Sequence, residues 1–273
     1  MDITGNAVIF GGGGGIGRST ALLFAQSNAS AVVVADLNLE AAESAAAEAK
    51  RAATNPKFRA EALRVDVTIQ ESVDSVFDHV TTSIGRMDYC VNCAGFPVKT
   101  ARQTADADVA EFFRVQDINL RGTFFVVRAA CAIMRSQDLL PNLAEFPERG
   151  STRGSIVTLG SVLSLGASPY LMQYTTSKHA VLGLTKTAAI DHAADGIRVN
   201  CVCPTWVDTN MTKQVCEDVP GIEETLIPSV PLGRIAKPEE IADAIVFLSS
   251  PRASFVTGCP FIIDGGASLS SNR

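Results

Sequence analysis

The sequence AVIFGGGGGIGRSTALLF, residues 7–24, decides the fold of this 273-residue chain. The apolar run Ala7–Phe10 predicts a buried strand, and the periodic pattern of Ile16–Ser27 predicts a helix. Glycine occupies positions 11–15 and 17 between them. Glycines let a backbone approach a pyrophosphate closely, and the free N–H groups at a helix start favour its charge. The strand–turn–helix order therefore predicts a dinucleotide site. Its expected contacts are Gly11, Gly15, Ile16 and Gly17.

The rest of the chain repeats this order of a short apolar strand followed by a helical pattern. Continuous apolar strands separated by helices are typical of a parallel sheet covered on both faces. The sequence thus predicts an α/β fold with a single doubly wound parallel sheet, Rossmann-like in architecture. The expected strands are Ala7–Phe10, Ala31–Ala35, Ala60–Val67, Tyr89–Cys93, Ser155–Leu159, Ile197–Val202 and Phe261–Ile263. The expected helices are Ile16–Ser27, Leu39–Ala53, Ile69–Ile84, Val109–Arg135, Pro169–Ala194 and Pro238–Ser249.

The domain organisation is expected to be simple. The sequence contains no linker and no repeated period, so residues 1–273 are expected to form one domain. The segment Gln137–Gly154 is rich in proline, arginine and glutamate and is expected to be a surface loop. Three local signals predict helix starts. Thr68–Glu71 has the pattern of a capping box, and Ser168-Pro169 and Lys237–Glu240 each place a proline at the start of a helix.

Composition excludes several classes of function. Hydrophobic residues make up 47% of the chain and charged residues 19%, with a formal net charge of −6. The scattered Lys and Arg residues form no basic stripe, which argues against a nucleic-acid partner. No apolar run approaches the roughly 20 residues of a membrane helix. The first residues, MDITGNAVIF, lack the basic and apolar parts of a secretion signal, so a cytoplasmic protein is expected.

The seven cysteines are expected to be free thiols, because their number is odd and no secretion signal is found. Cys90 and Cys93 have the spacing of a metal or redox pair, but the sequence has no second such pair to complete a metal site. Their run, YCVNCAG, also resembles a strand. Small buried side chains are the favoured interpretation for them, and also for Cys201 and Cys203. The three histidines lack metal-ligand spacing, so no metal site is expected.

Asp36 ends the second expected strand, nineteen residues after Gly17. A carboxylate there can accept hydrogen bonds from the adenosine ribose and would repel a 2′-phosphate, which predicts NAD rather than NADP. Arg18 favours NADP, because a cation near this pocket could meet the phosphate. Asp66 and Val67 are expected to close the third strand, beside the adenine.

Tyr174 and Lys178 lie four residues apart on an expected helix, so their side chains share one face. Such a pair alone is weak evidence of function. Ser161 lies thirteen residues upstream of Tyr174, at the carboxyl end of an expected strand. Doubly wound sheets place their chemistry at such ends.

These residues belong to an ordered set of motifs: Gly11-x3-Gly15-x-Gly17, Asp66, Asn92-Cys93-Ala94-Gly95, Asn119, Ser161, Tyr174-x3-Lys178, Pro204–Thr209 and Asp264-Gly265-Gly266. With this set the chain resembles the short-chain dehydrogenase/reductase family from residue 6 to residue 266. The resemblance implies a Rossmann-like oxidoreductase with the catalytic tetrad Asn119, Ser161, Tyr174 and Lys178. It also implies cofactor contacts from Asp66, Val67, Asn92, Ala94, Gly95, Val207 and Thr209, beside those of Tyr174 and Lys178.

Each residue of the tetrad has an implied role. Tyrosine has an ordinary pKa of ~10, so a tyrosine that exchanges protons near neutrality needs positive neighbours. Lys178 and the nicotinamide ring would provide them, and Lys178 would also hold the nicotinamide ribose. Ser161 would hydrogen-bond the substrate oxygen, and Asn119 would position a water in the proton relay. Thr209 and the backbone of Val207 would hold the nicotinamide carboxamide.

Three positions depart from the family pattern. Phe10 stands where the family usually has threonine, Cys93 replaces the second asparagine of Asn-Asn-Ala-Gly, and Thr205 replaces a glycine. Phe10 puts in doubt the hydrogen bond that the usual threonine provides beside the first glycine. Thr205 puts in doubt the conformation of the loop that closes over the nicotinamide. None of them touches the tetrad.

The expected substrate pocket is formed by Phe96–Thr100, Val162–Met172 and Thr205–Pro231. Its side chains are mostly apolar with few cations, which predicts a small apolar substrate without a free carboxylate or phosphate. The apolar lining is Val162, Leu163, Leu165, Met172, Trp206, Met211 and Leu226.

Other features, such as PERGSTRG at 147–154 and TTSKHA at 175–180, resemble fungal members of natural-product pathways. The expected function is NAD-dependent interconversion of a secondary alcohol and a ketone on an apolar metabolite, such as a terpenoid or polyketide intermediate. One alternative is an NADP-dependent ketoreductase, which Arg18 would favour. The other is a catalytically silent dinucleotide-sensing protein, although such proteins usually lack part of the tetrad.

A homodimer or homotetramer is also expected. The helices Val109–Arg135 and Pro169–Ala194 carry more apolar residues than one sheet face can cover. The family usually pairs these helices between subunits.

Overall fold

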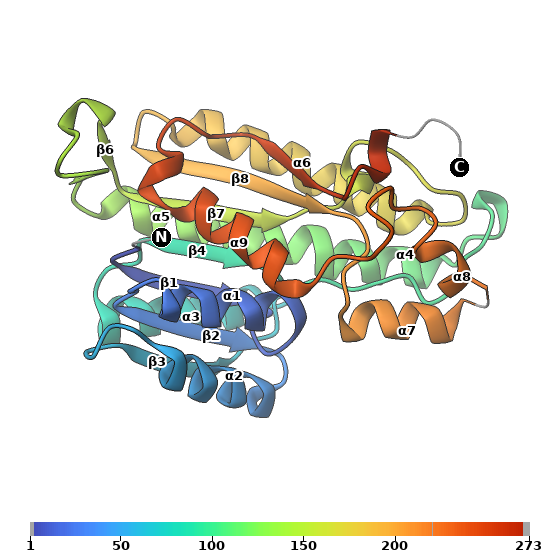
Figure 1. Cartoon of the computed structure of the whole chain (residues 1–273), viewed down its shortest axis with the longest axis horizontal. Coiled ribbons are helices and arrows are strands. Elements are labelled where there is room, and N and C mark those ends of the chain that lie inside the picture. The colour runs from blue at the N-terminus through green and yellow to red at the C-terminus, as the bar shows by residue number, and fades with distance from the viewer. Residues whose placement is uncertain (1–2, 220, 270–273) are drawn as a thin grey trace.

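Seven parallel strands form the central sheet in the order β3-β2-β1-β4-β7-β8-β9 (Figure 1). This is a computed structural model, and it describes residues 3–219 and 221–269. Helices cover both faces of the sheet, which confirms the predicted doubly wound α/β fold. The strands are β1 (Asn6–Phe10), β2 (Ala31–Asp36), β3 (Arg59–Arg64), β4 (Tyr89–Asn92), β7 (Gly154–Leu159), β8 (Ile197–Pro204) and β9 (Pro260–Ile263).

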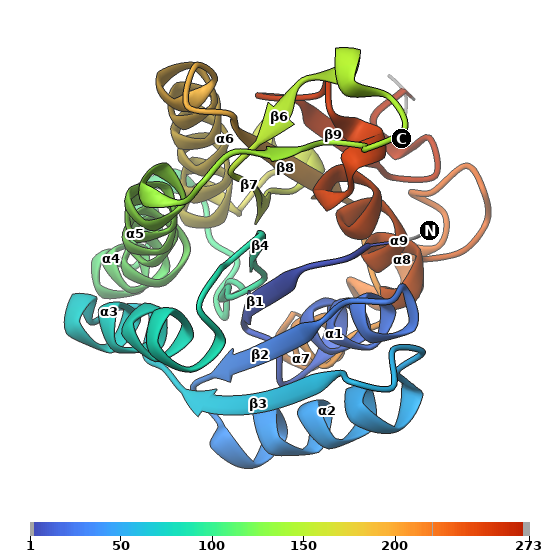
Figure 2. The same ribbon diagram turned by 90° about the vertical axis from the view of Figure 1, so that its left-hand side faces the viewer.

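Two apolar layers hold the helices against the sheet (Figure 2). Successive side chains of a strand point to opposite faces. In β1, Ala7 and Ile9 therefore pack on the side of α1, α2 and α9, whereas Val8 and Phe10 pack on the side of α3, α5 and α6. The bounds of these helices are α1 (Gly15–Gln26), α2 (Leu39–Ala52), α3 (Gln70–His79), α5 (Gly122–Ser136), α6 (Met172–His192) and α9 (Pro238–Ser249).

The strand order changes direction at β1, which pairs with β2 on one side and β4 on the other. Doubly wound sheets leave a crevice outside the carboxyl ends of the strands at such a point. The glycine turn follows β1, and the Asn92–Gly95 segment begins at the end of β4. The fold thus brings these two expected cofactor segments to the same crevice.

The expected helix Val109–Arg135 contains a π-helical turn. α4 (Val109–Gln116) continues through this wider turn, Asp117–Arg121, into α5. A Cβ on Gly122 would lie 2.8 Å from Val67 Cγ2, so glycine allows α5 to pack closely there. A π turn adds one residue to a helix and often marks a functional site. The apolar periodicity did not indicate this addition.

Two boundaries around the site differ from expectation. α6 begins at Met172 rather than Pro169, because Tyr170 has a φ of 67°, which a right-handed helix does not allow. β3 ends at Arg64 rather than Val67, so Asp66 and Val67 lie just beyond the strand. Asp66 Oδ1 accepts hydrogen bonds from the N and Oγ1 of Thr68 at 2.9 and 2.7 Å, which turns the chain.

Of the three predicted helix starts, the one at Lys237–Glu240 is confirmed, whereas the start at Ser168-Pro169 and the capping box at Thr68–Glu71 are wrong. The carboxylate of Glu240 accepts a hydrogen bond from Lys237 N at 2.8 Å, and α9 begins at Pro238 as expected. The capping box at Thr68 is wrong, because Asp66 takes up the Thr68 hydroxyl and no side chain caps α3. The helix expected to reach Ile84 changes at Val80–Ile84 into a second π-helical turn.

Several elements were not expected. The segment Gln137–Gly154 contains a short antiparallel hairpin, β5 (Leu140–Pro141) with β6 (Ser151–Thr152), at the end of the sheet away from the crevice (Figure 1). α7 (Asn210–Asp218) and α8 (Glu223–Leu226) follow β8, near the carboxyl ends of the strands. Within residues 3–219 and 221–269, no helix is long and apolar enough to cross a membrane.

Candidate active site

The glycine turn is too tightly packed for any other side chain at four of its positions, Gly11, Gly12, Gly13 and Gly17. A Cβ on Gly17 would lie 2.1 Å from the carbonyl oxygen of Gly11, and one on Gly11 would lie 2.5 Å from Ala94 N. A Cβ on Gly13 would lie 2.9 Å from the carboxyl carbon of Asp36. No side chain caps α1, so the N–H groups of its first turn remain available to an external acceptor. These features fit a bound pyrophosphate.

Asp36 lies at the end of β2, directly against this turn. Its Oδ2 accepts from Gly13 N at 2.9 Å, and its Oδ1 accepts from Asn38 N at 3.0 Å. The carboxylate is thus fixed by two backbone donors. Arg18 is turned toward α2, where Nε donates to Glu48 Oε2 at 2.8 Å and the guanidinium also contacts Ser44. The cation that favours NADP therefore already has a carboxylate partner.

The segment after β4 connects the glycine turn to the helices of the opposite face. Asn92 is 1% exposed; its Nδ2 donates to Thr123 Oγ1 at 2.8 Å, and its Oδ1 accepts from Ala94 N at 3.3 Å. A Cβ on Gly95 would lie 3.6 Å from Asn119 Oδ1 and 3.9 Å from Lys178 Nζ. Gly95 thus lies between two residues of the expected tetrad.

Lys178 is 5% exposed, and its Nζ donates to the carbonyl oxygen of Leu159 at 2.8 Å. The same ammonium lies 5.4 Å from the centroid of the Tyr174 ring. Leu159 ends β7, and Ser161 follows two residues later with its Oγ accepting from Leu163 N at 3.1 Å. Because this oxygen acts as an acceptor, the Ser161 hydroxyl proton remains available for donation.

Asn119 lies in the π-helical turn and is 1% exposed. Its Oδ1 accepts from Phe96 N at 2.7 Å, and its Nδ2 donates to Phe96 O at 3.1 Å and to Ser177 Oγ at 3.1 Å. Ser177 in turn donates to the carbonyl oxygen of Tyr174 at 2.8 Å. The side chain of Asn119 thus joins the segment after β4 to the helix that carries Tyr174 and Lys178.

The segment after β8 closes over the glycine turn. A Cβ on Gly15 would lie 3.1 Å from the methyl carbon of Thr209, and Thr209 caps α7 by accepting from Thr212 N at 3.3 Å. Val207 is 5% exposed and pairs with Ala236 in an isolated parallel bridge. Thr209 and the glycine turn are therefore placed to contact one ligand.

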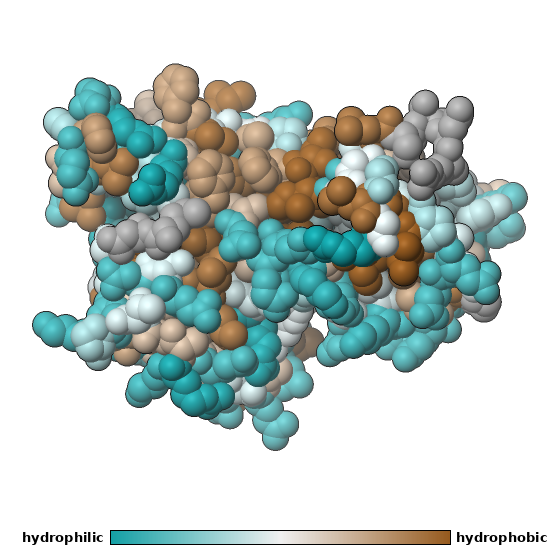
Figure 3. Space-filling view, viewed as in Figure 1, coloured by the Kyte–Doolittle hydropathy of each residue, from teal (hydrophilic) through white to brown (hydrophobic). Residues whose placement is uncertain are grey.

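The expected substrate end carries exposed apolar side chains. Brown apolar atoms gather in the right half of Figure 3, between the places where Figure 1 labels α6 and α8, whereas the atoms over α7 are mostly teal. Leu226 is buried. Four other apolar side chains of this region are exposed: Leu165, Met211, Ile227 and Leu232. Two cations lie near Phe96, with the Arg114 guanidinium 4.6 Å and the Lys99 ammonium 5.8 Å from its ring centroid. The sequence pattern did not indicate the approach of Arg114.

The three departures from the family pattern have structural explanations. Phe10 is fully buried, with its ring centroid 5.3 Å from that of Phe77. Burial raises the pKa of Cys93 to about 12, which keeps it a neutral thiol. Thr205 N donates to the carbonyl oxygen of Ile263 at 3.3 Å, so its backbone continues the pairing of β8 with β9.

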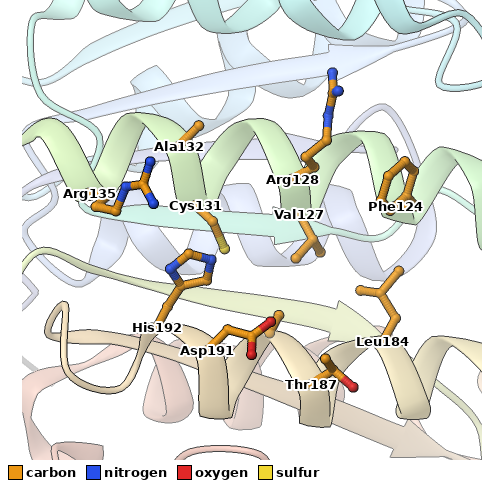
Figure 4. A pocket seen from close by; sticks show the side chains of 11 residues that line it. Phe124, Val127, Arg128, Cys131, Ala132, Arg135, Leu184, Thr187, Asp191 and His192 are labelled. Atoms are coloured by element: carbon orange, nitrogen blue, oxygen red, sulfur yellow. The ribbon is translucent and has the colours of Figure 1, made fainter.

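A groove lies outside the crevice, between α5 and α6 (Figure 4). It has a volume of about 510 Å³, and apolar side chains of both helices face it, among them Phe124, Val127 and Leu184. None of the expected tetrad lines it. In the described part of the chain, no group of three or more His, Cys, Asp or Glu residues is placed to hold a metal ion.

Sequence reasoning missed three residues that organise the site. Glu111 and Gln173 bond to each other and to the segment after β4, and Ser177 joins Asn119 to α6. Ser177 repeats the helical face of Tyr174 at a spacing of three, which was an available signal. Glu111 and Gln173 are 62 positions apart, so no local pattern pairs them.

Known proteins resemble this chain over almost its whole length. The family described as Enoyl-(Acyl carrier protein) reductase matches residues 12–268. The short-chain dehydrogenase fogB of Aspergillus ruber is 52% identical over 99% of both chains. The short-chain dehydrogenase RED2 of Pyricularia oryzae is 51% identical and covers 100% of this chain and 99% of its own length. The solved structure of levodione reductase matches with a TM-score of 0.86 at 30% identity, covering 97% of this chain and 98% of its own.

Proposed function

The chain belongs to the short-chain dehydrogenase/reductase family and is an NAD(P)-dependent oxidoreductase that acts on alcohols. From this premise we propose that it uses NAD to interconvert a secondary alcohol and a ketone on an apolar metabolite, such as a terpenoid or polyketide intermediate. Residues 1–273 would act as one domain. The full-length fungal relatives and the exposed apolar side chains after β8 support this substrate class.

The observation that carries the proposal is the buried ammonium of Lys178 beside the Tyr174 ring. The phenol of Tyr174 can take the proton from an alcohol or return it to a ketone oxygen, and Lys178 would stabilise the negative charge that this transfer leaves. Ser161 donates its free hydroxyl proton to the same oxygen and stabilises the charge that develops there. Asn119 fixes the segment after β4 beside this pair.

NAD fits the cofactor side of the crevice. The glycine turn and the N-terminus of α1 would hold the pyrophosphate, and Asp36 would accept the ribose hydroxyls. When bound, the nicotinamide supplies the two-electron redox chemistry. Lys178 would hold the nicotinamide ribose, Thr209 and Val207 the carboxamide, and Asp66 and Val67 the adenine. The competing NADP assignment depends on Arg18, whose guanidinium is instead bound to Glu48.

We further propose that the groove between α5 and α6 is covered by the same face of a second copy. Phe124 is 45% exposed at its edge, and Val127, Leu184 and Ala188 supply apolar surface (Figure 4). A closed two-fold contact would bury this surface in a homodimer or a homotetramer. The proposal also includes a cytoplasmic location, which the seven free cysteines favour, because thiols stay reduced there.

A panel of apolar secondary alcohols and ketones, each tested with both cofactors, checks the proposal by absorbance of the reduced cofactor. We expect turnover of cyclic or bicyclic compounds with NAD at a higher kcat/KM than with NADP. Acidic and phosphorylated compounds of similar size serve as the matched comparison and should react poorly. Turnover restricted to NADP, or to charged substrates, would contradict the proposal.

A further inference from the structure

The carboxylate of Glu111 gathers hydrogen bonds from two segments that border the crevice. Oε1 accepts from the backbone N of Lys99 at 2.6 Å and of Thr100 at 3.2 Å. Oε2 accepts from Thr100 Oγ1 and from Gln173 Nε2, the latter at 3.2 Å. Asp108 caps α4 by accepting from Glu111 N at 2.9 Å, so Glu111 lies in the first helical turn. The helix N-terminus favours a negative charge at that place.

Residues 96–102, here called the substrate-side loop, are also fastened at both ends. At one end Asn119 holds the N and O of Phe96. At the other end Arg102 N donates to the carbonyl oxygen of Tyr170 at 3.3 Å. Glu111 holds the middle of the loop, so the three contacts together fix its course past the crevice.

Gln173 links this loop to the reacting residue. It is 2% exposed and directly precedes Tyr174. Its Nε2 contacts Thr100 O at 3.4 Å as well as Glu111, and its carbonyl oxygen accepts from Gln116 Nε2 at 2.8 Å. The entry of α6 is thus bonded to two residues of α4 and to the loop.

All four donors to Glu111 are neutral, so two acceptor oxygens are what the position requires. A glutamine has the same shape but one acceptor oxygen and one NH2 group. Its NH2 group would face donors that the carboxylate now accepts from. Glu111→Gln therefore removes about half of the contacts without changing the size of the side chain.

We propose that Glu111 is a positioning residue that holds the substrate-side loop against the residue before Tyr174. This sets how the substrate oxygen is presented to Tyr174 and Ser161. The inference rests on the proposed function, because the loop matters only if a substrate binds beside Tyr174. Cofactor binding depends on the other side of the crevice and is not affected.

Hydrogen–deuterium exchange of the purified full chain tests the contact without requiring turnover. In Glu111→Gln, the amides of residues 96–102 should exchange about tenfold faster, which corresponds to about 1.4 kcal/mol. Glu239→Gln is the matched control, because it removes a first-turn carboxylate from α9, which packs against α1 instead. Thr100→Val breaks one contact of Glu111, and Gln173→Leu breaks the contacts of its Nε2 with Glu111 and with Thr100 O. Neither variant removes the oxygen that accepts from the loop amides, so each should give a smaller increase. Unchanged exchange of the loop in Glu111→Gln would overturn the proposal.

Kinetics with 2-decalone and NADH test the consequence for the substrate. We expect the KM for 2-decalone to rise about tenfold in Glu111→Gln, with the Kd for NADH and the melting temperature unchanged. Glu111→Gln and Gln173→Leu should be non-additive, because they break one shared network. A lower melting temperature with an unchanged KM would assign Glu111 to stability and overturn the proposal. If the wild type turns over no member of the panel, the proposed function fails while the exchange result still stands.

Discussion

On the cofactor side of the crevice, close packing fixes the backbone of the glycine turn. On the substrate side, hydrogen bonds from polar side chains fix the backbone of residues 96–102. At Gly17 a single added carbon would lie 2.1 Å from the carbonyl oxygen of Gly11, so the turn itself leaves no space there. On the other side, the course of residues 96–102 depends on hydrogen bonds to Glu111 and Asn119. The two sides therefore respond differently to substitution.

This difference has a physical consequence for specificity. A packed backbone turn tolerates almost no change, so it suits a ligand that does not vary, such as a dinucleotide. A loop held by a few hydrogen bonds can be rearranged by one substitution, so it suits a substrate that varies between relatives. Tyr174 and Lys178 lie where the two sides meet, because Lys178 reaches both Gly95 and the end of β7.

The largest expected effect separates chemistry from cofactor binding. Tyr174→Phe should lower kcat by about a thousandfold, because we propose that the phenol moves the proton. Its Kd for NAD should stay within about threefold of the wild-type value, because the glycine turn and Asp36 are untouched. Lys178→Ala should impair both quantities. Steady-state kinetics with fluorescence titration of NADH measures them, and full activity in Tyr174→Phe would remove Tyr174 from the reaction.

The next effect tests the packed side. Gly17→Ala should weaken NAD binding by about a hundredfold, equivalent to about 2.7 kcal/mol, because the added Cβ displaces the turn. Gly183→Ala is the matched control: it lies exposed in α6, where an added Cβ meets no atom within 4 Å. This control should be neutral or should stabilise the protein by about 0.5–1 kcal/mol. Equal NAD affinity in the two variants would show that packing does not govern this side.

The success of sequence reasoning follows the same division. Ala7–Phe10 and the glycines after it are a local pattern whose strand and turn do not depend on distant residues, and both are found. The π turn at Asn119 and the positive φ of Tyr170 were not predicted. Asn119 bonds to Phe96, 23 positions away, and Glu111 bonds to Gln173, 62 positions away. Such pairings arise only once the chain is folded, so one sequence does not reveal them.

A smaller effect is expected at the groove between α5 and α6, outside both sides of the crevice. Phe124→Glu places a charge on a ring that is 45% exposed in the single chain, so the fold should tolerate it. It should reduce the solution mass from that of an oligomer toward 28.8 kDa, with kcat changed by less than about threefold. Light scattering measures the mass. A wild-type protein that is already monomeric at micromolar concentration would contradict the proposed interface.

The smallest effect concerns the buried thiols. Burial raises the pKa of Cys93 and of Cys131 to about 12, and it raises that of Cys90 as well. Because the thiolate is the reactive form, these residues should resist alkylation from pH 7 to pH 9. Activity should survive the treatment, and unfolding should make all three reactive. Mass spectrometry of treated native protein checks this, and rapid labelling of Cys93 would show that the junction of the two sides opens.

The central claim is that the packed frame presents the Asp36 carboxylate to the cofactor and so selects NAD. The decisive measurement is the ratio of kcat/KM with NAD to that with NADP, in the wild type, in Asp36→Asn and in Asp36→Asn/Leu37→Arg. Asparagine keeps an acceptor for the N of Gly13 but removes the charge that would repel a 2′-phosphate. We expect a wild-type ratio of about ten to a thousand, a ratio closer to one in Asp36→Asn, and a reversed preference in the double variant. A wild-type ratio at or below one would contradict the claim and would show that Arg18, not Asp36, determines the preference between NAD and NADP.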